Sequence, residues 1–222
     1  MFLVPTGVLL AALLAVVTYR RKYKYCYSFA AYLAAELVGC GIQIVHRAFF
    51  DDWYPFTAKE ALYALLRVLI LAELGLLIFR TLPRARKRVQ ILLAATVLVL
   101  FVVLSMRYDT TSAYTLAKDI LSRFDYVTAW GLIALLVLIV WYQLPLHSFH
   151  KAILHGMLWL LLAHFGAVYA AKFIDGPLAG HLYNTVQLVI LVVWLRAAWA
   201  AELPLGPDEV DVVRYLQPWR KP

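Results

Sequence analysis

Five polar side chains interrupt the apolar stretches of this sequence and are the residues most able to do chemistry. They are Glu36, Arg67, Glu73, His164 and Gln187. A charge near the centre of a bilayer costs at least about 2.5 kcal/mol, so such a side chain usually faces a partner or a hydrated space. A carboxylate, a guanidinium, an imidazole and an amide that converge inside a helix bundle could bind a solute or conduct protons.

The predicted depths of these residues make such a cluster feasible. Counted from the predicted helix ends, Glu36, Arg67, His164 and Gln187 fall within about two helical turns of the midplane. Glu73 lies nearer the cytoplasmic side, on a different face of its helix from Arg67. The alternative is structural: Arg67 could form a buried ion pair with Glu36 or Glu73 that fixes the helix register. Both roles are left open.

Histidines offer a second kind of site. His46 and His181 lie near the predicted outer surface and could ligate haem only if their helices are neighbours. Three further histidines near the inner surface match no standard zinc spacing. We therefore predict no cofactor and no metal, and interfacial hydrogen bonding for the histidines.

Enzyme signatures are missing from the sequence. It contains no Walker loop, GxSxG, HExxH or EF-hand loop, and residues 181–200 carry no lysine for a retinal Schiff base. Cys26 and Cys40 lie about 21 Å apart on one predicted helix, too far to form a disulfide. We expect a protein that is not an enzyme.

Composition indicates whether these residues lie in a soluble or a membrane protein. Hydrophobic residues make up 64% of the 222 residues and charged residues 15%, whereas soluble domains are nearer half and a quarter. The net charge of +8 comes from basic residues beside the ends of apolar runs, where they set topology and meet lipid headgroups rather than nucleic acid. We predict a multi-pass integral membrane protein, of bacterial cytoplasmic membrane type, with bound lipid.

The apolar runs predict an all-α domain over residues 1–200 and a short cytoplasmic tail over 201–222. The N-terminus is expected outside and the C-terminus inside, because basic clusters such as 83–88 mark the cytoplasmic loops. An amphipathic segment over 110–126 is expected to lie on the outer surface. The seven predicted transmembrane helices are residues 2–18, 26–49, 60–80, 89–106, 127–142, 152–173 and 181–200.

A constant shift of 120 residues indicates a 3+1+3 repeat. It aligns Ser28-Phe29 with Ser148-Phe149, Leu62-Tyr63 with Leu182-Tyr183, and Ile70-Leu71 with Ile190-Leu191. The first three helices would then correspond to the last three in the same orientation. Chance matches between abundant Leu and Ile residues are the alternative explanation.

Scattered residues also carry a family resemblance. With FAAYL at 29–33 and LGLLIFR at 74–80 before a Pro/Arg loop, the chain resembles small seven-helix membrane proteins of acidobacterial type. The 3+1+3 order is similar to that of SWEET-like and PQ-loop proteins, but their Pro-Gln signature is absent. The first resemblance implies the helix count and no activity.

Three functions fit these observations. The leading hypothesis is a non-catalytic subunit or scaffold that binds other membrane proteins, because the sequence has no soluble domain and many interfacial tryptophans. The alternative is a small-solute transporter with a midplane site between the two three-helix halves. A further alternative is a sensor module that signals to a separate cytoplasmic partner.

Overall fold

The structure is a computed structural model that describes residues 2–80, 113–141, 146–173 and 176–200. These residues form six α-helices and two short 3-10 turns, η1 (Lys22–Lys24) and η2 (Arg47–Phe50), and no strand, so the all-α prediction is confirmed for them. The predicted helix 89–106 and the tail 201–222 lie outside the described residues. The helices are α1 (Leu3–Tyr19), α2 (Tyr27–Val45), α3 (Trp53–Arg80), α5 (Ala113–Trp141), α6 (Ser148–Ala170) and α7 (Gly176–Trp199).

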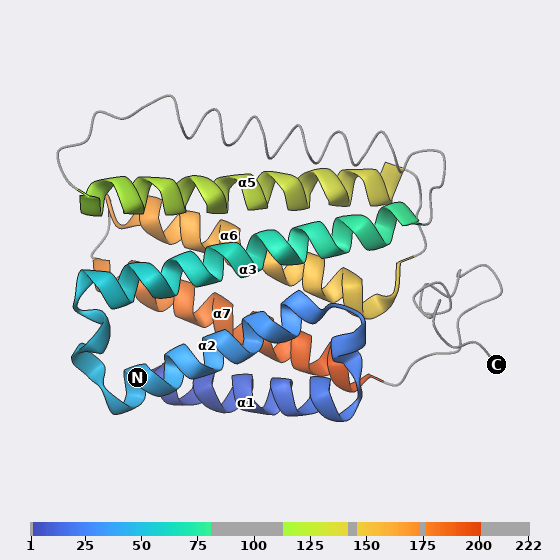
Figure 1. Cartoon of the computed structure of the whole chain (residues 1–222), viewed down its shortest axis with the longest axis horizontal. Helices are drawn as coiled ribbons and strands as arrows, with labels where there is room; N and C mark the ends of the chain where they lie inside the picture. The colour runs from blue at the N-terminus through green and yellow to red at the C-terminus, as the bar shows by residue number, and fades with distance from the viewer. Residues whose placement is uncertain (1, 81–112, 142–145, 174–175, 201–222) are drawn as a thin grey trace.

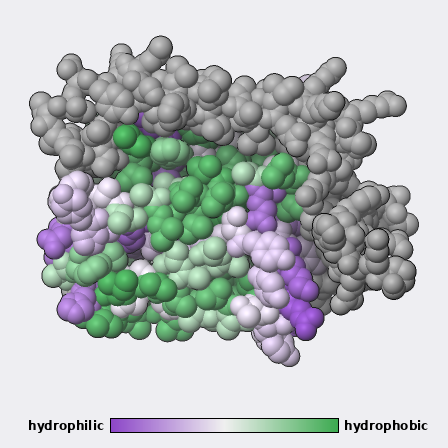
Figure 2. Space-filling model, viewed as in Figure 1, coloured by the Kyte–Doolittle hydropathy of each residue, from purple (hydrophilic) through white to green (hydrophobic). Residues whose placement is uncertain are grey.

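Helix length and surface character identify an integral membrane protein. Five helices, α2, α3, α5, α6 and α7, are long and apolar enough to cross a bilayer, and α1 is a shorter apolar helix of 17 residues. Figure 2 shows apolar residues over the middle of the visible face and hydrophilic residues towards its two sides. We call these sides the Arg20 end, where α1 and α7 finish, and the Asp51 end, where α2 finishes and α3 begins.

The described helices pack as a closed ring. Going round it, α1 packs on α2, α2 on α3, α3 on α5, α5 on α6, α6 on α7, and α7 back on α1 (Figure 1). A few contacts between α3 and α6 cross the ring. Neighbours run antiparallel except for the pairs α3–α5 and α7–α1, which run in the same direction. Side chains from each helix therefore meet in a shared interior.

The described helix boundaries differ from the predicted ones most at the starts of α3 and α5, and by up to five residues at other ends. α3 begins at Trp53, seven residues before the predicted start at residue 60. Pro55 fits in its first turn because the N–H groups there have no intrahelical bonds to lose. The described part of the predicted surface segment, 113–126, and the following helix are one continuous helix, α5, while residues 110–112 lie outside the described residues. The prediction of a separate segment was wrong because Asp125 shares one face of α5 with the buried Thr128 and Leu132.

The helices α1–α3 and α5–α7 occupy corresponding positions along the sequence. Shifting α2 and α3 by 120 residues places them on α6 and α7 within a few residues, whereas α1 matches the end of α5 with a shift of 122. At that second shift a threonine hydroxyl repeats its bond: Thr6 donates to the Phe2 carbonyl at 2.9 Å and Thr128 to the Phe124 carbonyl at 2.8 Å. Buried residues pair in the same way: Leu10 with Leu132, Leu13 with Leu135, Val17 with Ile139, Phe29 with Phe149, Leu33 with Ile153 and Ile70 with Ile190.

Candidate functional site

A buried ion pair between α3 and α5 forms one side of the site. Nη1 of Arg67 donates to both carboxylate oxygens of Asp125, at 2.8 and 2.9 Å, and both side chains are less than a tenth exposed. The predicted partners of Arg67, Glu36 and Glu73, were therefore wrong. Asp125 takes that place because α5 lies beside α3 in the ring and its inward face reaches the depth of Arg67.

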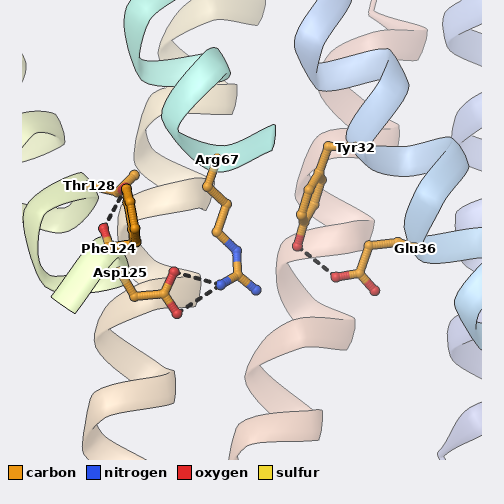
Figure 3. A network of polar contacts seen from close by, with 6 residues as sticks. All are labelled: Tyr32, Glu36, Arg67, Phe124, Asp125 and Thr128. Carbon is orange, nitrogen blue, oxygen red and sulfur yellow. Dashed lines mark hydrogen bonds and ion pairs between the residues drawn. The ribbon is translucent and has the colours of Figure 1, made fainter. Parts of the chain in front are cut away.

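The rest of the Arg67 guanidinium is not used by the ion pair. Among the described residues, its Nε is buried and has no hydrogen-bond partner, and both bonds to Asp125 come from Nη1. The guanidinium carbon lies 6.0 Å from the centroid of the Tyr32 ring. In Figure 3, Arg67 stands between Asp125 on one side and Tyr32 with Glu36 on the other. An unmet buried donor is costly, so this edge of the guanidinium is suited to an acceptor that the protein itself does not supply.

Glu36 forms the opposite side of the site. Its Oε1 accepts a 2.7 Å hydrogen bond from the Tyr32 hydroxyl one helical turn earlier on α2 (Figure 3). The carboxylate has no ion-pair partner within the described residues, although Arg67 lies close enough for its charge to act on Glu36. Glu36 shares the buried face of α2 with Phe29, Tyr32 and Leu33, so it points into the ring rather than towards lipid.

Helices α6 and α7 close the site with His164 and Tyr183. The two rings meet edge to face with centroids 5.7 Å apart, and the charges of Arg67 and Asp125 act on both. Gln187 lies one turn beyond Tyr183 on the inward face of α7 and is half-buried. We call the set Tyr32, Glu36, Arg67, Asp125, His164 and Tyr183 the interior cluster; it draws on five of the six described helices.

The inward faces of the helices change in exposure at the depth of this cluster. On α6, Met157 and Leu160 are buried, His164 one turn later is half-buried, and Val168 is 57% exposed. On α7, Trp194 and Leu191 are buried, whereas Gln187 and Tyr183 are half-buried. This change is confined to α6 and α7, because Cys40 of α2 and Tyr63 and Ala64 of α3 stay buried on the Asp51 side of the cluster.

Glu73 belongs to a different structure. Its carboxylate accepts bonds from the backbone N–H groups of Tyr27 at 2.9 Å and Ser28 at 2.8 Å, and from the Cys26 thiol at 3.4 Å. These are unpaired amides at the start of α2, so Glu73 of α3 caps a neighbouring helix and complements its dipole. Two turns separate it from Arg67, and it takes no part in the interior cluster.

The histidines proposed as haem ligands lie apart from the cluster. His46 and His181 are both exposed, and α1 packs between α2 and α7 in the ring. The His181 ring instead contacts Phe2, with centroids 5.4 Å apart. The structure records no contact between the two histidines within its described residues.

Three members of the interior cluster escaped prediction. Tyr32 and Tyr183 stand four residues before the predicted site residues Glu36 and Gln187, so helical periodicity could have placed them on the same faces. Asp125 was grouped with nearby charged residues as part of a surface segment. Its signal was the apolar stripe of Leu132, Leu135 and Ile139, which extends back to it.

The interior cluster is a polar centre inside an apolar helix ring, with one paired cation, one carboxylate lacking an ion-pair partner, and aromatic hydroxyl and imidazole groups. Comparison of the chain with family models, with curated proteins and with solved structures finds no match.

Proposed function

We propose that this protein is a membrane transporter that binds a small polar solute at the interior cluster. The observation that carries the proposal is the convergence of polar side chains from both three-helix sets, α1–α3 and α5–α7, at one depth of the bundle. Polar groups held inside a bilayer mark substrate and ion pathways more often than they serve packing.

The arrangement of the two helix sets supports alternating access. We propose that α1–α3 and α5–α7 are duplicated halves related by an axis along the membrane normal, in agreement with the shifts of 120 and 122 residues and the ring order. Transporters built from such parallel repeats bind their substrates near the midplane, between the halves. The Arg67–Asp125 pair joins one half to the other at this level.

The exposure pattern supports one open side. We propose that the cluster opens towards the Asp51 end, and the basic residues Arg20, Arg21 and Lys24 gather at the Arg20 end, where the inward faces of α6 and α7 are packed. By the positive-inside rule we propose that the packed end is cytoplasmic, with the N-terminus outside, in a bacterial cytoplasmic membrane. The described form would then be open to the outside.

The proposal is tested by asking whether water reaches the ring interior. The variants Gln187→Cys and His164→Cys are made in a background in which Cys26 and Cys40 are replaced by alanine, and are treated in proteoliposomes with a membrane-impermeant thiol reagent. The matched control is Val189→Cys, two residues from Gln187 on α7 and 58% exposed on the outward side. We expect reaction at positions 187 and 164 and none at 189, where lipid covers the side chain.

Reagent supplied to either side of the membrane distinguishes a transporter from other functions. A transporter exposes position 187 to both sides in turn, so both supplies should label it. Labelling from one side alone would indicate a fixed receptor-like site and thus the sensor alternative. Failure to label either interior position would overturn the proposal and leave the scaffold or subunit function.

A further inference from the structure

The interior cluster has two unfilled recognition elements of opposite charge. The first is the Nε edge of Arg67, which is buried and unpartnered within the described residues. The second is Glu36, a carboxylate that receives one hydroxyl bond from Tyr32 and has no cation paired with it in that same part of the chain. The two lie on either side of Tyr32, and the free side of the guanidinium faces Tyr32 and Glu36 in Figure 3.

The guanidinium edge is suited to a carboxylate. Asp125 occupies Nη1 alone, which leaves Nε and Nη2 as a parallel pair of donors on the adjacent edge. This fork matches the two oxygens of a planar carboxylate, and bidentate pairing of this kind is stronger and more specific than a single contact. Asp125 already neutralises most of the Arg67 charge, so the site does not favour a bare anion.

Glu36 is suited to an ammonium group. A half-buried carboxylate inside an apolar ring is unfavourable without a cation or a proton, and the cations near it among the described residues, Arg67 and Lys59, pair with Asp125 and Glu60. The Tyr32 hydroxyl donates one hydrogen bond to Oε1 of Glu36, so the other carboxylate oxygen can accept a bond from a further donor.

From these two elements we infer that the solute is a small zwitterion, an amino-acid-like molecule whose carboxylate binds the Nε–Nη2 edge of Arg67 and whose ammonium group binds Glu36. The inference rests on the proposed transporter function and names its substrate class. A zwitterion brings both charges without changing the net charge of the cluster, which limits the cost of its transfer into the bundle.

The experiment measures binding of charge-separated probes to the purified full-length protein in nanodiscs. Glycine, β-alanine and 4-aminobutyrate vary the distance between ammonium and carboxylate, while ethylamine and propionate carry one group each. We expect one of the three zwitterions to bind at least about tenfold more tightly than either single-charge probe, since each charge-assisted contact contributes separately. Equal binding of propionate and the best zwitterion would overturn the role of Glu36, and equal binding of ethylamine would overturn that of Arg67.

Two variants are designed to retain a cation beside Asp125 and an acceptor for the Tyr32 hydroxyl. Arg67→Lys retains a cation for Asp125 but lacks the planar second edge, so binding of the best zwitterion should weaken at least about tenfold. Glu36→Gln keeps the size and the acceptor for Tyr32 but loses the charge, so the preference for the zwitterion over propionate should disappear. Unchanged zwitterion binding in both variants would overturn the assignment even if the wild-type protein prefers a zwitterion.

Failure of this inference is separable from failure of the proposed function. If no zwitterion binds while positions 164 and 187 still label from both sides, the transporter proposal stands and the substrate class is wrong. If these positions do not label, both proposals fall.

Discussion

Phe29 and Phe149, 120 residues apart in the chain, pack edge to face with ring centroids 6.0 Å apart, and both are fully buried. Under the proposed duplication, matched residues are expected to touch only near the axis that relates the halves. This contact, between the starts of α2 and α6 near the Arg20 end, is where that proposal puts the axis.

This aromatic contact should carry measurable coupling between the halves. In a double-mutant cycle of Phe29→Leu and Phe149→Leu, we expect an interaction energy of about 0.5–1.5 kcal/mol in detergent-mediated unfolding, from the edge-to-face geometry. The matched control pairs Phe29→Leu with Phe173→Leu, because Phe173 is 73% exposed. Coupling in the control as large as in the test pair would argue against a specific contact.

The Arg67–Asp125 ion pair should stabilise the bundle chiefly by avoiding a lone buried charge. Asp125→Ala leaves Arg67 unpaired and should lower the free energy of unfolding by about 3–5 kcal/mol. Replacing both residues by alanine should cost much less than the sum of the single changes. Asp51→Ala, at an exposed position, is the control and should change stability by less than about 0.5 kcal/mol. Additive single effects would contradict a direct pair.

Replacing Gly156 even by alanine is expected to lower the stability of the fold. A Cβ at this position would collide with the indole ring of Trp194, which is buried between α6 and α7 and donates a 2.9 Å bond to the Ala152 carbonyl. Gly156→Ala should therefore destabilise the protein by about 1–3 kcal/mol. Gly166→Ala on the same helix meets open space and should gain up to about 1 kcal/mol from helix propensity. An unchanged or raised unfolding midpoint in Gly156→Ala would show that the Trp194 contact is unimportant.

Glu73 should protect the first turn of α2. Removing its carboxylate in Glu73→Ala leaves the amides of Tyr27 and Ser28 without acceptors, at a cost of about 1–3 kcal/mol. Hydrogen exchange at these two amides should accelerate, while exchange near the end of α2 should not change. Glu73→Gln retains one acceptor oxygen and should give an intermediate effect. Exchange rates equal to those of the wild type would disprove the cap.

The Cys26 thiol should resist ionisation. Burial, followed by the nearby Glu73 carboxylate, raises its pKa above the ordinary cysteine value of about 8.5. Maleimide labelling of folded protein at pH 8, in a Cys40→Ala background, should be much slower than labelling of the unfolded chain.

The same shift predicts the pH dependence of stability. Above about pH 8.5 the unfolded thiol loses its proton while the folded thiol keeps it, so the unfolded state binds fewer protons and stability falls as pH rises. Cys26→Ser should remove this part of the slope. An identical slope in the variant would assign the pH dependence to other groups.

Apolar run length was enough to predict the described helices, and helical depth was enough to place Glu36, Arg67 and His164 near one level. Depth says nothing about which helices are neighbours. Asp125 is the partner of Arg67 because α5 lies beside α3. Glu73 caps α2 because the start of α2 lies beside the end of α3. Both are properties of ring order, which apolar helices with similar faces do not encode in any local pattern.

Asp125 illustrates a second limit. Its charged neighbours predicted a surface segment, and only the buried stripe that continues from Thr128 to Ile139 shows that the same helix carries this residue inward. In a membrane helix a charge follows the face of its helix, not the average polarity of its surroundings in sequence.

The length of α1 has a consequence for the surrounding lipid. Its 17 residues span about 26 Å, less than the roughly 30 Å of a typical hydrocarbon core, while Val4 and Val8 on its outer side are largely exposed. The bilayer must thin beside α1, or Tyr19 and Arg20 must extend to reach the headgroups. Of its neighbours, α7 has 24 residues, whereas α2 has 19 and spans about 28 Å. Hydrophobic mismatch is therefore greatest beside α1 and smaller beside α2, and membrane thickness should bias how α1 tilts against α2 and α7.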